Sequence, residues 1–169
     1  MDRLLPDDRI LVLDGAMGTM LQRHGLTGPG QVYNLTSPEV VASIHREYID
    51  AGADIIETNT FSGGYETSLA GARIARSVAD AASRKIIVAG SVGPTTKSLS
   101  ICSDYDRPDA RALSFDAMAD AYSGQIRGLL DGGVDVLLLE TCFDALNAKA
   151  AICAWNAAGR KVPVIVSGT

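Results

Sequence analysis

Three acidic residues each follow directly after a short run of apolar residues: Asp14, Glu57 and Glu140. Short runs of Val, Ile and Leu are typical of parallel strands that are buried on both faces of a sheet. In parallel α/β proteins, functional groups gather just beyond the carboxyl ends of such strands. We therefore expect the three carboxylates to converge at one mouth, where they suit capture of an ammonium group or orientation of a neighbouring polar residue.

Each acid also has a structural interpretation, which the sequence leaves open. Asp14 begins a glycine-rich stretch, residues 14–19, and could cap that turn instead of meeting a ligand. Either Glu57 or Glu140 could pair with a Lys or Arg side chain, as buried acids usually must. The stretch is neither a Walker phosphate loop nor a GxGxxG dinucleotide fingerprint, and acids at the mouth would repel a phosphate.

Further residues extend the predicted pocket. Asn59, Thr60 and Phe61 continue the second strand exit and offer an amide, a hydroxyl and an apolar wall. A turn predicted around Gly90 and Ser91 could present backbone N–H groups to an anion such as a carboxylate, or could serve only as a rigid connection. We assign pocket-shaping roles to these residues and assign no catalytic residue.

The cysteines and histidines do not predict a metal site. Cys142 stands two residues after Glu140, but no CxxC or HxxH spacing accompanies it. His24 and His45 fall on separate predicted segments, and zinc needs several converging ligands. We expect Cys142 to be a small apolar filler, and we expect no metal site built from this chain alone.

Apolar runs and segments of helical periodicity alternate along the chain. The predicted strands are residues 10–13, 55–56, 86–89, 136–139 and 162–166. The predicted helices are residues 38–52, 65–83, 115–130 and 145–158. Ser37, Ser114 and Asp144 are the expected N-caps of the first, third and fourth helix. This alternation predicts a parallel sheet with right-handed crossovers.

An internal repeat favours a barrel over an open sheet. Residues 50–58 resemble residues 131–141: each has a helix end, a glycine turn, an aspartate that opens a strand, and Glu-Thr at the strand exit. The copies belong to the second and fourth predicted strands, and alternate strands of a (βα)8 barrel fill the same interior layers. A doubly wound sheet remains the alternative.

Composition indicates one soluble globular unit. The 169 residues are 47% hydrophobic and 21% charged, and a net charge of -5 argues against a nucleic-acid partner. No apolar run approaches the roughly 18 residues of a membrane span, and the first residues lack the apolar stretch of a secretory signal. Three cysteines without a disulfide pattern fit a reducing compartment, so we expect a cytoplasmic protein.

The length accounts for only part of a barrel. A complete (βα)8 barrel takes about 250 residues, whereas the pattern contains five strands and four helices. Three explanations are open: a fragment of a longer protein, a half-barrel completed by a second chain, or a complete open sheet. We expect the first, with residues 1–169 forming the N-terminal portion of a barrel domain.

Several motifs together resemble the homocysteine S-methyltransferase family. Residues 10–20, 51–61 and 93–95 resemble its domains, and residues 140–151 look most like its cobalamin-dependent methionine synthase branch. The resemblance implies a (βα)8 barrel that binds homocysteine and transfers a methyl group to its sulfur, giving methionine. In that branch the donor is methylcobalamin carried on another domain, which implies folate- and cobalamin-binding domains as partners.

The resemblance also implies roles for individual residues. Asp14 and Glu140 match contacts to homocysteine, with Glu140 facing its amino group, while Asn59, Gly90 and Ser91 help shape the pocket. In the family, zinc coordinates the thiol and favours the thiolate nucleophile. The zinc cysteines of the family, including a Gly-Gly-Cys-Cys-Gly motif, are absent from this sequence, so we expect the chain to be inactive by itself.

Two hypotheses from other functional classes remain. The chain could be a non-catalytic half-barrel module whose open sheet edges pair with a second copy or with a complementary chain. It could also be an unrelated, complete α/β enzyme that uses Asp14, Glu57 and Glu140 as acid–base groups.

Overall fold

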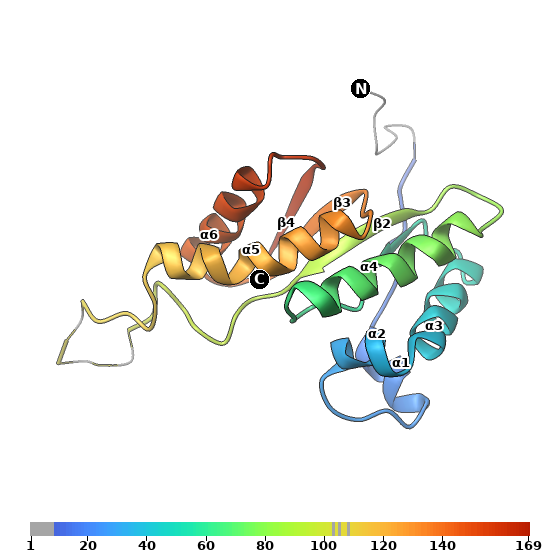
Figure 1. The fold of residues 1–169 in the computed structure, drawn as a ribbon, viewed down its shortest axis with the longest axis horizontal. Helices are drawn as coiled ribbons and strands as arrows, with labels where there is room; N and C mark the ends of the chain where they lie inside the picture. Colours follow the sequence, from blue (N-terminus) through green and yellow to red (C-terminus); the bar gives the residue numbers. More distant parts are fainter. Residues whose placement is uncertain (1–8, 103, 105, 108) are drawn as a thin grey trace.

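The computed structural model describes residues 9–102, 104, 106, 107 and 109–169. In these residues, four parallel strands form one sheet in the order β1-β2-β3-β4. The strands are β1 (Ile55–Glu57), β2 (Ile87–Val92), β3 (Val136–Cys142) and β4 (Val164–Gly168). The predicted α/β class with a parallel sheet is confirmed (Figure 1).

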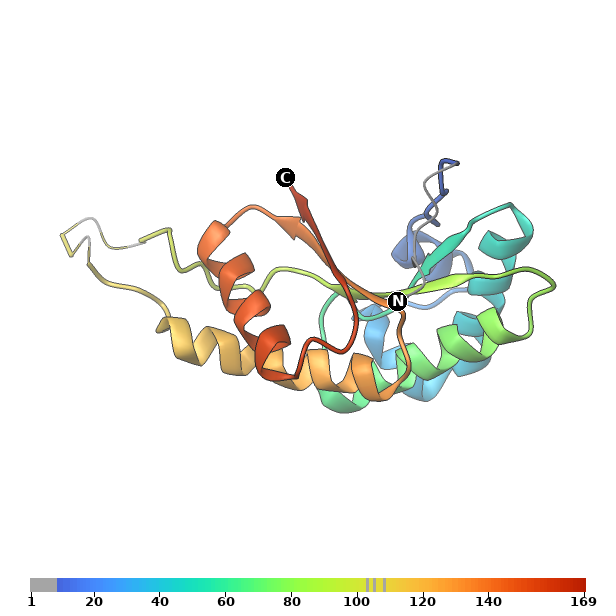
Figure 2. The same cartoon turned by 90° about the horizontal axis from the view of Figure 1, so that it is seen from above.

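Three helices connect successive strands. They are α4 (Tyr65–Asp80), α5 (Phe115–Asp131) and α6 (Ala145–Ala157). All three lie on the same face of the sheet (Figure 2). Helices on a single face form the outer layer of a (βα)8 barrel, whereas a doubly wound sheet carries helices on both faces. The arrangement therefore agrees with the barrel interpretation of the internal repeat.

Four further helical segments precede β1. They are α1 (Met17–Arg23), the 3-10 helix η1 (Gly30–Val32), α2 (Tyr33–Thr36) and α3 (Pro38–Asp50). The described residues thus contain six α-helices and four strands, against the four helices and five strands predicted. None of these helices has both the length and the apolar character needed to cross a bilayer.

Residues 10–13, the first predicted strand, do not join the sheet. Leu13 forms only an isolated parallel bridge with Ile55. The Val12 carbonyl accepts hydrogen bonds from both Asp54 N (2.8 Å) and Ile55 N (3.1 Å), which interrupts a regular ladder. Because β1 has only three residues, the segment lies beside it without extending the sheet.

Helix α1 begins inside the stretch predicted to be a glycine-rich turn. Met17 and Leu21 pack in one apolar cluster with Val41 and Ile44 of α3. Most helix stability in proteins comes from such packing, and here it outweighs the low helix propensity of Gly18. The turn is therefore shorter than predicted.

Two of the three predicted N-caps are confirmed. Ser114 Oγ accepts the Ala117 N–H at 3.2 Å, and Asp144 Oδ1 accepts the Leu146 N–H at 2.9 Å. Ser37 precedes α3, but its side chain makes no capping hydrogen bond. It also ends α2, and its φ of -148° and ψ of 53° differ from the extended conformation of a capping residue.

The sheet is buried on both faces, as its apolar strands predict. The face toward the helices packs against small and apolar side chains of α4, α5 and α6, and its strand residues are Ile56, Val88, Val92, Leu137 and Leu139. The opposite face forms a second cluster, whose buried members are Ile87, Ala89, Val136 and Leu138. Alternate residues of each strand thus serve different layers.

The internal repeat is visible in the structure at the start of β1 and β3. Gly52 and Gly133 both take a left-handed backbone, with φ of 110° and 87°. Asp54 and Asp135 follow, and each accepts hydrogen bonds from arginine and from the backbone N–H of a neighbouring segment. The partners are Arg9, Arg84 and Val12 N for Asp54, and Arg76 and Val88 N for Asp135. Arginine therefore neutralises the acids at the strand entries.

Candidate functional site

The carboxyl ends of the strands open into a cavity of about 600 Å³, called here the mouth. The structure brings Asp14, Glu57 and Glu140 together on its wall. Its other polar lining residues are Gln31, Thr58, Asn59, Thr60, Ser62 and Ser91. No Lys or Arg side chain of the described residues lines the mouth, so arginine pairing, which neutralises the strand-entry acids, is not seen for the strand-exit acids.

Asp14 is held in place by the backbone of β1. Its N–H donates to Ile55 O at 2.9 Å, and both of its carboxylate oxygens accept the Glu57 N–H at 3.0 Å. Burial raises the pKa of Asp14 to about 7, although backbone hydrogen bonds lower it; the charge of Glu140 adds to the rise. At neutral pH this carboxyl is therefore poised between its neutral and charged forms.

The turn after Asp14 lies close to α3 at its first position, Gly15. A Cβ on Gly15 would lie 3.1 Å from the Tyr48 ring, tighter than an ordinary contact. The Tyr48 hydroxyl donates to Ala16 O at 3.2 Å and so ties the turn to α3. Glycine thus lets the backbone beside Asp14 approach α3 closely.

Glu140 stands at an irregularity in β3. Leu139 pairs with Val166 and Cys142 pairs with Gly168, so three residue steps on β3 face two on β4. Thr141 takes a positive φ of 55°, which is uncommon for a β-branched residue. Such bulges are frequent next to active sites, where they change the direction of a side chain.

Glu140 and Glu57 line the mouth from the strands on either side of β2. The Ser91 hydroxyl of β2 donates to Glu140 Oε1. Burial raises the pKa of Glu57 to about 8, and the charges of Glu140 and Asp14 raise it further. The mouth therefore brings carboxyl groups from two strands to one cavity.

Asn59 and Thr60 line the mouth but are largely engaged with the protein. Asn59 Nδ2 donates to Gly30 O (2.8 Å) and to Asn34 Oδ1 (2.9 Å), which fixes η1 beside the cavity. Thr60 is completely buried, and its hydroxyl donates to Ser91 O at 2.8 Å. Both side chains thus shape the wall, and the exposed ring of Phe61 completes it.

The turn predicted around Gly90 and Ser91 is wrong, because both residues belong to β2. Pairing with β3 continues as far as Val92 and so keeps this segment extended. The Ser91 N–H donates to Thr58 Oγ1 at 3.0 Å. A Cβ on Gly90 would point at Leu137, 3.1 Å away, on the helix-facing side. Ser91 reaches the mouth through its hydroxyl, whereas Gly90 does not line it.

Several residues that support the site were not predicted. Tyr48 carries the turn after Asp14, and Asn34 braces Asn59. Gln125 of α5 donates from Nε2 to Thr60 O at 2.6 Å. For Gln125 the available signal was a polar residue on the buried face of a predicted helix, but that pattern does not identify its partner; Asn34 lies outside the predicted helices.

The described residues do not fit a zinc site. No group of three or more His, Cys, Asp and Glu side chains among them could hold a metal ion. Cys142 Sγ donates to Leu139 O at 3.5 Å and packs against the helix-facing core, and burial raises the pKa of its thiol. A metal-binding thiolate requires the opposite shift. We therefore assign no step to a metal on these residues, and Cys142 agrees with the filler interpretation.

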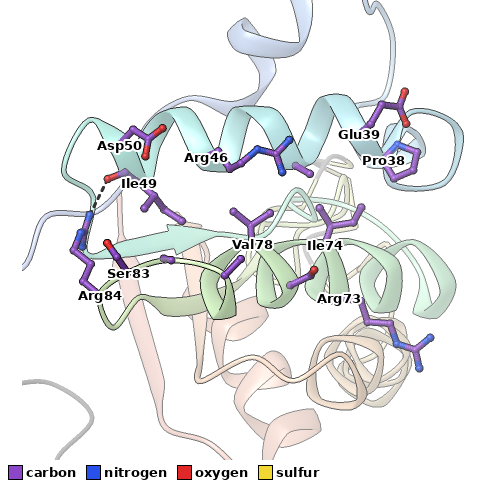
Figure 3. A pocket seen from close by; sticks show the side chains of 14 residues that line it. Pro38, Glu39, Arg46, Ile49, Asp50, Arg73, Ile74, Val78, Ser83 and Arg84 are labelled. Carbon is purple, nitrogen blue, oxygen red and sulfur yellow. Dashed lines mark hydrogen bonds between the residues drawn. The ribbon is translucent and has the colours of Figure 1, made fainter.

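A larger cavity of about 820 Å³ lies on the outer face, between α3 and α4 (Figure 3). Its floor includes Ile49, Ile74 and Val78, and Glu39 and Arg46 stand at its rim. None of the three strand-exit acids lines it. The mouth, which combines the acids with a cavity at the carboxyl ends of the strands, is the better candidate for chemistry.

Comparison with protein families distinguishes between the functional classes that the geometry of the mouth allows. The family model described as homocysteine S-methyltransferase matches residues 11–169. The chain belongs to the homocysteine S-methyltransferase family. The family predicted from the motifs is thereby confirmed, and the matched residues include all three strand-exit acids.

Solved structures agree with this membership. The apo form of the homocysteine methyltransferase MmuM from Escherichia coli matches with a TM-score of 0.77 and 25% identity, over 96% of this chain and 60% of that one. Its metallated form matches with a TM-score of 0.76 and 25% identity, over 93% and 62% of the two chains. The chain thus spans about 60% of the length of these homocysteine methyltransferases and shares their barrel-type fold over that part.

Proposed function

We propose that the mouth binds homocysteine, and that residues 1–169 are the N-terminal, homocysteine-binding portion of a methyltransferase domain. The observation that carries this proposal is the convergence of Asp14, Glu57 and Glu140 in a chain of this family. Carboxylates accept strong, charge-assisted hydrogen bonds from an ammonium group. With no Lys or Arg among the described lining residues, an ammonium ligand is favoured over an anion.

Asp14 and Glu140 are the residues that we propose to hold the ammonium group. Ser91 fixes the Glu140 carboxylate through its hydroxyl. Asn59 keeps the wall formed by η1 in place. Phe61 offers an apolar surface at the rim. The role of these residues is to bind and orient the amino-acid part of the substrate.

The reaction that we propose for the whole protein is methyl transfer to the homocysteine sulfur, of the methionine synthase type. Support comes from the family and from the resemblance of residues 140–151 to that branch. We further propose methylcobalamin as donor, folate- and cobalamin-binding domains as partners, and the cytoplasm as location. Bound zinc would favour the thiolate form of the homocysteine sulfur. Ligands for zinc are not found among the described residues.

Calorimetric titration of the purified chain with homocysteine tests the binding proposal. We expect Glu140→Gln and Asp14→Asn each to weaken binding roughly tenfold or more, because hydrogen bonds to charged groups contribute about 1.5–3 kcal/mol. Glu39→Gln makes the same change on the outer face and should leave affinity unchanged (Figure 3). Unchanged affinity in both site variants would contradict the assignment.

The expectation that this chain alone is inactive needs a separate assay. Purified protein is incubated with homocysteine, zinc and methylcobalamin, and methionine is quantified. We expect homocysteine binding without methionine formation. Turnover at a rate proportional to protein concentration would show that the 169 residues suffice for the reaction.

A second candidate function is assembly through the edges of the described sheet. Ile10 is 90% exposed and Val12 54% on the segment beside β1, and Val166 is 47% exposed on β4 at the other edge. Apolar edges of this kind promote strand pairing with another chain. Sedimentation velocity at several concentrations tests it: a dimer supports assembly, and a monomer throughout the range refutes it.

A further inference from the structure

The ring of Phe61 lies where Gly93 has no side chain. Ala89 and Ser91 of β2 lie on the face of the sheet that leads to the mouth, since Ala89 belongs to the cluster on that face and Ser91 lines the cavity. Gly93 follows Val92, the last residue of β2, and is next in this alternation. A Cβ on Gly93 would lie 2.8 Å from two carbons of the Phe61 ring and 2.5 Å from the Phe61 carbonyl oxygen. The ring therefore occupies the space that any other side chain at position 93 would fill.

Hydrogen bonds also hold the backbone around Phe61. The Gly93 N–H donates to Phe61 O at 2.9 Å. The preceding residue is held as well, because Thr60 Oγ1 donates to Ser91 O at 2.8 Å and Gln125 Nε2 donates to Thr60 O at 2.6 Å. A side-chain rotation of Phe61 would therefore not relieve the clash between a Cβ at position 93 and the Phe61 carbonyl, and the backbone would have to shift.

The ring that is held in this way remains open to the cavity. Phe61 is 47% exposed and lines the mouth together with Asp14 and Glu140. Carboxylates bind the ammonium group of an amino acid but do not favour its apolar side chain. An aromatic ring offers an apolar surface for CH2 groups and makes favourable contacts with sulfur. Among the described residues that line the mouth, Phe61 is the only aromatic one.

We propose that Gly93 is a positioning residue, which holds the Phe61 ring at the rim of the mouth so that the ring packs against the sulfur-bearing side chain of the ligand. Gly93 and Phe61 then select an amino acid by its side chain, while the acids select it by its ammonium group. This inference rests on the proposed function for the identity of the ligand. The dependence of the ring position on Gly93 rests only on the contact between the two residues.

Fluorine NMR measures the effect on the ring. The chain has three phenylalanines, so protein labelled with 4-fluorophenylalanine should give three resonances, and Phe61→Leu identifies one of them by its loss. We expect Gly93→Ala to shift the Phe61 resonance more than that of the distant Phe115. Gly124→Ala, where the methyl group has room, should leave the Phe61 resonance in place. Homocysteine should shift the Phe61 resonance of the wild type.

Calorimetry measures the contact between the ring and the ligand. Homocysteine and 2-aminobutanoic acid differ only in the thiol group. Phe61→Ala and Gly93→Ala should each reduce the preference for homocysteine over 2-aminobutanoic acid by roughly threefold or more, because each loses the contact between sulfur and the ring. The double variant should lose about as much as Phe61→Ala alone, since Gly93 acts through the ring. Gly124→Ala should keep the preference of the wild type.

The outcomes separate this inference from the proposed function. An unshifted Phe61 resonance in Gly93→Ala, an unchanged preference in that variant, or an additional loss of preference in the Phe61→Ala background would overturn the positioning role. If Gly93→Ala shifts the resonance but homocysteine gives the wild type neither a shift nor binding heat, the positioning role stands and the proposed ligand is wrong. The wild type gives a result even if Gly93→Ala folds poorly: binding heat without a shift of the Phe61 resonance would refute the contact between ring and ligand.

Discussion

Two glycines of α5 provide a matched test of how closely the helices pack. A Cβ on Gly128 would lie 2.4 Å from Tyr65 O and 3.1 Å from Leu69 N, both backbone atoms of α4. A Cβ on Gly124, one turn earlier, would meet nothing closer than Tyr65 N at 3.9 Å. Alanine should therefore be tolerated at Gly124 and rejected at Gly128.

The expected magnitudes follow from two opposing effects. In a helix interior with room for the methyl group, alanine stabilises by about 1 kcal/mol relative to glycine, which is the result expected for Gly124→Ala. At Gly128 the methyl group would force α4 and α5 apart, and overpacking typically costs about 1–3 kcal/mol. The helix-propensity gain is common to both variants, so they should differ by the overpacking cost, about 1–3 kcal/mol.

Urea unfolding followed by far-UV circular dichroism measures this difference. Both variants should show the same dependence of unfolding free energy on urea as the wild type, so that the midpoints report stability alone. We expect the Gly124→Ala midpoint above that of the wild type and the Gly128→Ala midpoint below it. Equal stability of the two variants would refute the close approach of α4 and α5.

Three further predictions concern the site and the fold. Ser91→Ala should weaken homocysteine binding roughly tenfold in calorimetry, because Glu140 loses a hydrogen-bond donor. Asp144→Ala should lower the free energy of unfolding by about 3 kcal/mol. The reason is that this carboxylate caps α6 and also accepts hydrogen bonds from residues 98–100. The control variant Asp116→Ala, at an exposed position, should change the free energy of unfolding by less than about 1 kcal/mol. His45 is completely buried, and burial lowers its pKa from 6.5 to about 4. Because the unfolded chain binds the proton first as pH falls, urea unfolding should show the wild type losing about 3 kcal/mol relative to His45→Leu between pH 7 and pH 4; parallel pH profiles would contradict the buried neutral imidazole.

Periodicity and end signals were sufficient to predict most of the fold. The alternation of apolar runs with helical segments gave the parallel sheet, and Ser114 and Asp144 marked helix starts by their own side-chain chemistry. Ser37 failed as a cap because the end of α2 fixes its backbone, which is a tertiary effect. Residues 10–13 failed as a strand because a strand depends on the length of its partner, and β1 is short.

The position of the site could be predicted from the sequence, but the hydrogen bonds and strand pairing within it could not. The position of Asp14, Glu57 and Glu140 after apolar runs predicted their convergence, since strand order alone brings the exits together. Ser91 was predicted in a turn because glycine suggests one, yet pairing with β3 kept it in a strand. The hydrogen bond from Ser91 to Glu140 joins side chains of β2 and β3, which no local pattern in the sequence reports.

The central claim is that the acids of the mouth recognise an ammonium group. It is tested most directly by comparing the affinities of homocysteine and 4-sulfanylbutanoic acid, which differ only in that group. The account predicts that wild-type protein binds homocysteine at least about tenfold more tightly, and that Glu140→Gln reduces this preference, because charge-assisted hydrogen bonds contribute about 1.5–3 kcal/mol. Equal affinities of the wild type for the two compounds would contradict it.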